Sequence, residues 1–366
     1  MTRPRIFFLL PLLMLALLLP VACSSAPPSK QDVIVSLTGD LIVPRFQTVA
    51  AETGQLRDAL HSLCADPNRD TLDAARTAWR EARAPWLRSQ SMWFGPVMDR
   101  RSRILVDWSP VDPERIEATL ARRETVSASD VREFFGSTQR GLGAIEYVIF
   151  AADSEALASL GDPAGIRCQY LTALGDVVAD EMSGVLADWT GDGAAGSGYA
   201  GYFQGTAGVA LVDQQAVDEV VRTSVFITRS INDMRLGKAL GADGVEPDPS
   251  SIPGGNGHNA VTDLRSQVLG MQDTYLGAGA EGSLGISALV QGVSKEADER
   301  MRGHFTAALE SIDGLQEPLQ ATIVSDPEPA RLAHQRIQEL QRALNTEVVS
   351  LLGVTVGFAD TDGDGG

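Results

Sequence analysis

Apolar residues recur at helical spacing along most of the chain, and this pattern limits the fold more than any other feature of the sequence. One stripe comprises Val217, Val221, Ser224, Thr228 and Ile231, and another comprises Ile337, Leu340, Leu344, Val348 and Leu351. Because residues three or four positions apart share one face of an α-helix, each stripe predicts an amphipathic helix with a buried side. Strand signals are scarce by comparison. We therefore predict an all-α fold made of helical bundles.

The helical patterns fall into two groups. Beyond the two stripes they cover about 32–64, 69–84, 141–152, 164–189, 260–276 and 284–313. Between the groups, the segment from Thr190 to Gly208 is too rich in glycine for a packed element. A chain of 366 residues has room for two domains at about 100–200 residues each. We place an N-terminal helical bundle at 31–192 and a C-terminal helical bundle at 205–366, packed side by side.

A second irregular segment lies inside the C-terminal group. Gly237–Asn259 contains three prolines and repeated glycines, which disfavour regular structure. The pattern predicts a surface loop. A loop of this length within a compact domain is more often functional or mobile than ordinary.

The first 22 residues resemble a bacterial export signal. Arg3 and Arg5 precede an apolar run, residues 6–22, that contains no charged side chain and ends just before Cys23. Such a run is at the short limit for a membrane-spanning helix and fits the apolar core of a signal peptide. We predict a signal peptide at 1–22.

The cleavage region, Leu19–Cys23, resembles a bacterial lipobox, although Pro20 replaces the usual leucine three places before the cysteine. Cys23 is the predicted lipidation site, and residues 23–30 form the predicted lipidated tether. Ser24 is not the aspartate associated with retention in the inner membrane. We expect an exported protein of the periplasm or cell surface, anchored in the outer rather than the inner membrane. A secreted protein cut nearby is the alternative.

The charge of the chain is strongly acidic. Removal of residues 1–22 deletes two arginines and no acidic residue, so the formal net charge changes from -18 to -20. The sequence contains no basic cluster that could follow a phosphate backbone, which argues against nucleic acid and acidic lipid as partners. Contact with the membrane is expected only through the lipid. A metal ion or a cationic envelope protein suits this charge better, although solubility alone also explains it.

Two cysteines remain once Cys23 is assigned to the lipid. Cys64 and Cys168 form an even pair in an oxidising compartment, which predicts a disulfide. It would close a loop of roughly a hundred residues and stabilise the fold by about 4 kcal/mol on the chain-entropy model. Two buried free thiols are the alternative.

The segment Gln139–Tyr147, with the sequence QRGLGAIEY, carries a recognisable motif. It is similar to the signature of the imelysin family, which has the pattern G-x-H-x-x-E within a helix. Gly141 and Glu146 match this pattern, whereas Gly143 occupies the histidine position. Further stretches resemble the same family and extend the similarity over the predicted mature chain, namely 78–86, 167–171, 346–348 and 352–355.

This resemblance implies two helical bundles with a ligand site near their junction, built around the histidine and glutamate of the signature. Family members are exported; some are regulated by iron, and some have been described as metallopeptidases. Iron is therefore the expected cofactor or cargo, with another divalent or trivalent metal as the alternative. Positions 143 and 146 share one face of a helix. Gly143 supplies no ligand, and a catalytic zinc usually needs three protein ligands, so only Glu146 is carried over as a metal or ligand-binding residue.

Other residues are candidates for completing the site. His258 lies in the glycine-rich loop and could reach Glu146 if the loop folds across it; a solvated loop histidine is the alternative. Asp107, together with Asp233 and Arg235, could place charge at the domain junction, with Asp233 as a possible metal ligand. Paired or solvated helix charges are the alternative and the favoured explanation of these residues.

Three functions are compatible with these features. The first is a cell-envelope lipoprotein that binds a metal ion, expected to be iron, or presents it to an uptake partner. The second is a metallopeptidase acting on periplasmic polypeptides, which the glycine at the histidine position argues against. The third is an interaction scaffold without metal, holding another envelope protein in the groove between the bundles. We expect no catalytic residues.

Overall fold

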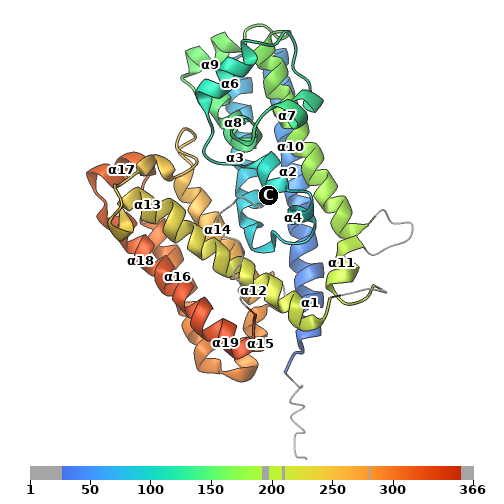
Figure 1. Ribbon diagram of the computed structural model, residues 1–366, viewed down its shortest axis with the longest axis vertical. Helices are drawn as coiled ribbons and strands as arrows, with labels where there is room; N and C mark the ends of the chain where they lie inside the picture. Colours follow the sequence, from blue (N-terminus) through green and yellow to red (C-terminus); the bar gives the residue numbers. More distant parts are fainter. Residues whose placement is uncertain (1–26, 192–197, 208–210, 280–281, 356–366) are drawn as a thin grey trace, which may run out of the picture.

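In the computed structural model, residues 27–191, 198–207, 211–279 and 282–355 are described, and within these ranges the chain is helical with no strand (Figure 1). The predicted all-α fold is confirmed. The predicted signal peptide and Cys23 lie outside the described residues.

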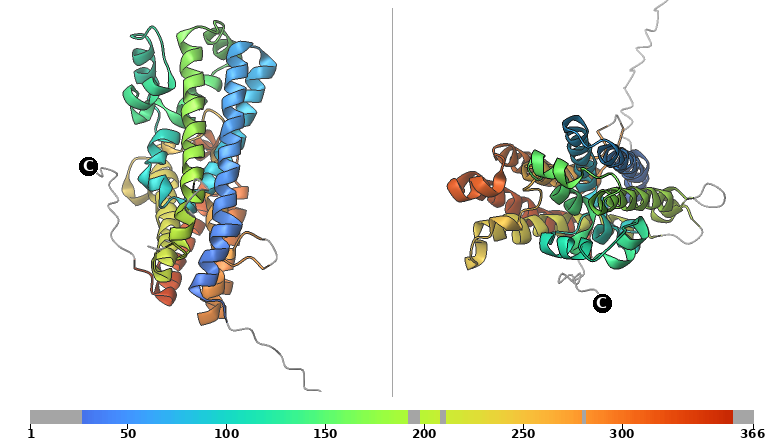
Figure 2. Two further views of the ribbon diagram at one scale, coloured as in Figure 1. Left: turned by 90° about the vertical axis from the view of Figure 1, so that its right-hand side faces the viewer. Right: turned by 90° about the horizontal axis from the view of Figure 1, so that it is seen from above.

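Long helices form the framework of the N-terminal half. A continuous helix comprises α1 (Lys30–Ser36), the π-helix η1 (Leu37–Ile42) and α2 (Val43–Ala65). It packs against α3 (Arg69–Arg88) and α10 (Ile166–Thr190), and the view in Figure 2 shows α2 and α10 side by side over most of their length. Shorter elements cover one end and one face: η2 (Gln90–Met92), α4 (Pro96–Asp99), α5 (Ser102–Val106), α6 (Pro113–Leu120), α7 (Ala128–Phe134), η3 (Ser137–Gln139), α8 (Gly141–Ile149), α9 (Asp153–Ser159) and α11 (Gly198–Phe203).

The helix over Lys30–Ala65 is long and apolar enough to cross a membrane by length and composition alone. Its apolar side faces the protein interior, because Phe46, Val49 and Leu56 are buried against the neighbouring helices. The pattern is that of a core helix.

The C-terminal half is a second bundle. Its helices α14 (Ala260–Leu276), α16 (Lys295–Asp313) and α18 (Glu328–Ala343) pack in succession, and α12 (Asp213–Arg229) packs against α14 and α18. The remaining elements are η4 (Ser230–Leu236), α13 (Gly237–Leu240), η5 (Ala242–Gly244), η6 (Pro249–Ser251), α15 (Ile286–Val293), α17 (Leu319–Ser325), η7 (Leu344–Val348) and α19 (Val349–Leu352).

The two halves meet where α14 lies along α3 (Figure 1). Their backbones approach closely at Gly270, where a Cβ atom would stand 2.1 Å from the carbonyl oxygen of Arg88. Just beyond α3, the hydroxyl of Ser91 donates to the carbonyl of Gly270 at 2.9 Å. This contact fixes the distance between the bundles and places α3 at the centre of the molecule.

The predicted helices are confirmed with small shifts at their ends. The pattern at 69–84 extends to Arg88 although Pro85 lies inside the helix, and the pattern at 284–313 is divided at Ser294 into α15 and α16. The first turn of α3 explains its start, because the side chain of Asn68 accepts hydrogen bonds from the backbone N–H groups of Asp70 and Thr71. The expectation that Thr190–Gly208 holds no packed element was wrong, because α11 (Gly198–Phe203) lies within this segment and Phe203 is buried against the rings of Phe94 and Trp189.

The segment Gly237–Asn259 differs from the predicted surface loop. Its first residues continue the preceding helix as α13, and its last part is covered by protein, with Ile252, Gly257 and Asn259 buried. The physical reason is that this part of the segment crosses the junction of the two halves and packs on α8 and α3. The middle of the segment, residues 244–247, is exposed as predicted, so the difference from a surface loop concerns its two ends.

Cys64 and Cys168 are neighbours at the adjoining ends of α2 and α10. Both are buried, and the structure contains them as free thiols. The Cys64 thiol lies 3.6 Å from the carbonyl oxygen of Cys168, and the Cys168 thiol lies 4.0 Å from that of Cys64. The predicted disulfide is therefore not present in this structure, whereas its two partners are adjacent; the bond itself stays a prediction.

We expect the protein isolated from an oxidising compartment to contain this disulfide. Replacing both cysteines by serine should then lower the free energy of unfolding by about 2–4 kcal/mol, because the unfolded chain loses a long covalent loop. Urea denaturation with and without reductant measures the difference, and non-reducing peptide mapping identifies the bond. The serine variant should not respond to reductant. Equal stability of the wild type in both conditions, with two free thiols in the peptide map, would contradict the expectation.

Candidate functional site

The signature segment begins α8, and its first glycine is required by the backbone. Gly141 has φ +80°, and a Cβ atom there would stand 2.4 Å from the carbonyl oxygen of Val106. Gly143 differs, since a Cβ atom there would meet the side chain of Val111 at 2.6 Å, while the nearest backbone atom, the carbonyl oxygen of Trp108, would lie at 3.7 Å, an ordinary contact distance. Val111 thus occupies the space into which a side chain at position 143 would point. This packing explains how the chain accommodates glycine where the signature has histidine.

Glu146 lies one turn further along α8 and is buried. Its Oε1 atom accepts a hydrogen bond of 2.8 Å from the backbone N–H of Gly257. Burial raises the pKa of this carboxyl group, while Arg83 and the backbone N–H groups of Gly257 and Asn256 oppose the rise. The glycine-rich loop folds across Glu146, the arrangement that His258 would need in order to reach it, but the contact is made by the backbone N–H of Gly257.

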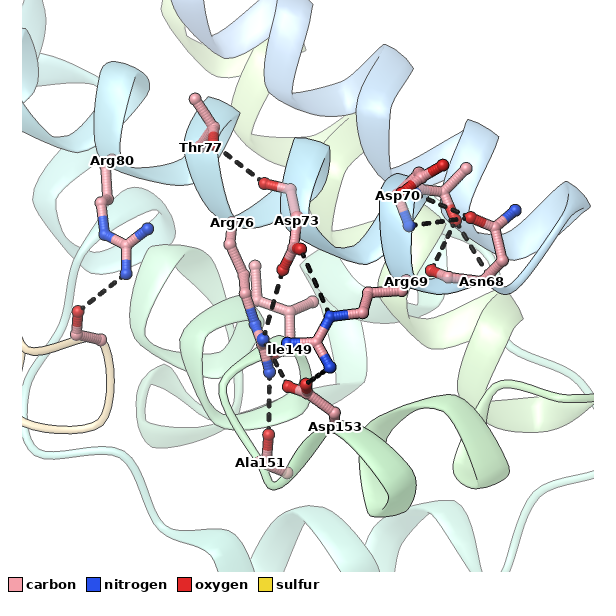
Figure 3. A network of polar contacts seen from close by, with 12 residues as sticks. Asn68, Arg69, Asp70, Asp73, Arg76, Thr77, Arg80, Ile149, Ala151 and Asp153 are labelled. Carbon is pink, nitrogen blue, oxygen red and sulfur yellow. Dashed lines mark hydrogen bonds and ion pairs between the residues drawn. The ribbon is translucent and has the colours of Figure 1, made fainter.

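Arginines of α3 hold this loop and the end of α8 in place (Figure 3). Arg80 donates to the carbonyl oxygen of Gly257 at 3.2 Å, so the backbone of Gly257 is bound through both its N–H and its carbonyl group. Arg76 donates to the carbonyls of Ile149 and Ala151 and pairs with Asp153 at 2.7 Å. Both contacts fix the segments that surround Glu146.

Arg83 is the central cation of the site. Its Nη1 lies 2.7 Å from Oδ1 of Asp107, and its Nε lies 2.7 Å from Oδ2 of Asp263, with all three side chains less than a tenth exposed. Burial lowers the pKa of Arg83, but the carboxylates of Asp107, Asp263 and Glu146 raise it by more. The guanidinium therefore stays charged. Burial raises the pKa of Asp263 to about 6, which leaves it ionised at neutral pH.

Asp263 comes from the first turn of α14, in the C-terminal half, whereas Arg83 and Asp107 come from the N-terminal half. The side-chain amide of Asn259 donates to the other oxygen of Asp263 at 2.7 Å. The loop covers this residue too, since a Cβ atom at Gly254 would stand 2.8 Å from Asp263. Carboxylates from both bundles, Glu146 and Asp263, therefore lie beneath one glycine-rich loop.

A second arginine, Arg235, enters from η4. Its Nη1 donates to Oε1 of Gln267 at 2.8 Å, and burial lowers its pKa while Asp107 and Asp263 raise it. The segment that carries Arg235 is a π-helix, and such segments are frequent at functional sites. The junction is thus lined by alternating carboxylate and guanidinium groups.

A family model for imelysin, of the peptidase class M75, matches residues 42–350. The chain belongs to the imelysin family. The chain is 24% identical over 301 residues to iron-regulated protein A of Synechococcus elongatus, covering 80% of this chain and 78% of that one.

Solved structures show the same imelysin fold. A protein named as an iron-regulated protein A precursor, from Parabacteroides distasonis, superposes with a TM-score of 0.77 at 19% identity and covers 90% of this chain and 97% of its own. An imelysin-like protein from Psychrobacter arcticum has a TM-score of 0.72 at 12% identity, and the match covers 91% of this chain and 100% of that one. At these identities the likeness concerns the fold alone.

The structure brings together only part of the predicted imelysin site. Glu146, Asp107 and Arg235 lie at the junction. His258 is exposed with φ +49°, and Asp233 is exposed and pairs with Arg229 at 3.2 Å. Neither side chain points to Glu146, because His258 stands at the outer turn of the loop and Asp233 on the outer side of η4.

Three residues of the site were not predicted from the sequence, namely Arg83, Asp263 and Asn259. A signal for Arg83 is present in the sequence, because Arg83 lies in the predicted helix at 69–84 and follows the large apolar residue Trp79 by one helical turn. Trp79 is fully buried, and its indole N–H donates to the carbonyl of Leu142 at 2.8 Å. A charged residue on a buried helix face requires a buried partner.

A resident metal ion does not fit this donor set. Among the residues that the structure describes, no group of three or more His, Cys, Asp or Glu side chains is placed to hold one ion. Asp107 and Asp263 are bound to Arg83, Glu146 is bound to the loop, and Gly143 supplies no donor. In this closed arrangement the guanidinium of Arg83 neutralises the carboxylates.

The raised pKa of Glu146 predicts how stability depends on pH. The unfolded carboxyl group ionises at a lower pH than the folded one, so the wild type should lose stability as the pH rises through the folded pKa. Glu146→Gln keeps an acceptor for Gly257 and removes the ionisation. Denaturation at pH 5 and pH 8 should show the variant gaining stability relative to the wild type at the higher pH. A difference that is independent of pH would contradict a raised pKa.

Proposed function

We propose that this imelysin-family protein is an exported, lipid-anchored binding protein of the cell envelope that handles iron as cargo rather than as a catalytic cofactor. The observation that carries the proposal is the placement of Glu146 and Asp263, one from each bundle, under the loop at 252–259. Opening of this loop would expose carboxylate oxygens from both halves, and hard cations such as ferric iron prefer oxygen ligands.

The iron assignment has two supports. One is the acidic composition of the chain, and the other is its similarity to proteins named for regulation by iron. The closed arrangement adds a condition: a cation must displace Arg83 from at least one carboxylate. We therefore infer that binding couples to movement of the loop and that an uptake partner receives or delivers the ion in that open state.

A metallopeptidase is the weaker proposal. Catalytic zinc usually takes three protein ligands and an open position for water, and the side chains around Glu146 do not provide this set. Hydrolysis of an unstructured protein that disappears with a chelator and with Glu146→Ala would favour the enzyme. An interaction scaffold without metal is the third possibility and predicts no metal affinity at all.

We expect the chain from residue 24 onward to bind ferric or ferrous iron, and to lose this binding in Glu146→Ala. The reason is that Glu146 is the carboxylate held only by backbone N–H groups and hence the one most readily released. Equilibrium dialysis with metal analysis measures the affinity for both iron forms and for zinc. Glu155→Ala, an exposed glutamate on α9, is the control and should bind as the wild type does. Absence of iron binding by the wild type would overturn the proposal.

A further inference from the structure

A groove of about 510 Å³ lies on the opposite side of α3 from the junction site, between α2, α3 and α14. Helix α3 borders both the junction site and the groove, since Arg83 lies at the junction and the next residue, Ala84, lines the groove. The groove is therefore separate from Glu146 and its loop. Its volume is within the range of small-molecule sites, about 300–1,000 Å³.

One end of the groove carries two arginines that share one carboxylate. Asp273 lies 2.9 Å from Nη2 of Arg45, and it pairs with Arg88 through both oxygens, at 2.6 and 2.8 Å. The side chain of Arg45 is only 15% exposed, and within the described part of the chain Asp273 is its one hydrogen-bond and ion-pair partner, so most of its N–H donors remain without a protein acceptor. This end has an excess positive charge, and its donors remain available for an anion.

The other end of the groove carries unpaired negative charge. Glu52 on α2 and Glu81 on α3 line it, and in the described structure neither forms an ion pair or a side-chain hydrogen bond. Glu52 follows Arg45 by seven residues on α2, and Glu81 precedes Arg88 by seven residues on α3. Because the two helices run antiparallel, both glutamates stand at the same end, and the rise of an α-helix puts about 10 Å between the two charged ends.

We propose that this groove binds a short linear peptide with free termini. The terminal carboxylate would be bound by Arg45 and Arg88, and the terminal ammonium by Glu52 and Glu81. An extended tripeptide spans about 10 Å, which matches the distance between the charged ends. Ala84, Pro85 and Leu269 supply apolar surface between these ends for the middle of the peptide. The proposal is independent of iron binding at the junction.

Isothermal titration calorimetry tests this proposal. The protein is the chain from residue 24, which contains every described helix, and the ligands are alanine and the alanine peptides of two to five residues. Tri-alanine should bind one to one and more tightly than the single amino acid. Amidation of its carboxyl end or acetylation of its amino end should weaken binding at least tenfold, since each change removes a charge-assisted contact. Absence of binding across the series at millimolar concentration would overturn the proposal.

Variants of the charged residues test which end of the groove binds which terminus of the peptide. Arg45→Gln should abolish the preference for a free carboxylate, and Glu52→Gln with Glu81→Gln should abolish the preference for a free amino group. The controls Arg57→Gln on α2 and Glu133→Gln on α7 lie outside the groove and should bind as the wild type does. Thermal melts verify folding, and Arg45→Lys should retain part of the affinity. Equal binding of free and blocked peptides, or binding of acetate as tight as that of tri-alanine, would contradict a peptide site.

Discussion

Replacing Arg83 with methionine is expected to lower the free energy of unfolding by about 3–5 kcal/mol. The substitution keeps most of the side-chain volume but leaves Asp107 and Asp263 buried without their cation, each having lost a contact of 2.7 Å. Ionised carboxylates in such a place are costly, and loss of Arg83 removes the charge that holds down the pKa of Asp263, so Asp263 should take up its proton at a higher pH than in the wild type. Urea denaturation at pH 7, compared with pH 5, measures the loss and its dependence on pH.

Two variants separate charge from packing in this experiment. Arg83→Met combined with Asp107→Asn and Asp263→Asn removes the uncompensated charges and should recover much of the lost stability. Arg80→Met removes an arginine from the same helix that makes one hydrogen bond of 3.2 Å, and we expect it to cost about 1 kcal/mol. A loss below this value for Arg83→Met would show that the ion pairs at the junction contribute little.

The Arg83 experiment also bears on the proposed cargo. If the carboxylates can accept an external cation, iron should raise the melting temperature of Arg83→Met more than that of the wild type, because the arginine no longer competes. The same addition should have no such effect on Arg83→Met with Glu146→Ala. An iron response that is identical in all three proteins would place the cation elsewhere.

Helical periodicity predicted most of the fold, because an amphipathic stripe depends only on residues that are close in sequence. The ranges 164–189 and 260–276 agree with α10 and α14 to within two residues. The division of the 284–313 pattern at Ser294 was not predicted. There the break depends on a capping contact, in which the Ser294 hydroxyl accepts from the backbone N–H of Ala297.

The candidate site was less predictable, because it depends on residues that are far apart in the chain. The signature motif identified Glu146, but nothing local indicates that Arg83 and Asp263, separated by 180 positions, form a buried pair. The contact between the loop and Glu146 is made by the N–H of Gly257, a backbone group that every residue except proline has. Such a contact cannot be predicted from the residue types. His258 in the same loop was a candidate ligand because of its side chain, but that side chain does not point to Glu146.

Replacing Gly141 with valine is expected to cost about 3 kcal/mol or more, in contrast to Gly143→Ala, which we expect to change stability by less than about 2 kcal/mol. At position 141 the left-handed conformation is strained for a β-branched side chain, and its Cβ would also meet the fixed carbonyl of Val106. At position 143 the one close contact of the new methyl group is with the Val111 side chain, which can move, and alanine favours a helix more than glycine does. Thermal and urea unfolding of both variants provide the comparison. If Gly141→Val unfolds as Gly143→Ala does, the start of α8 can shift away from Val106, and the position of Glu146 would then not depend on the first glycine of the signature.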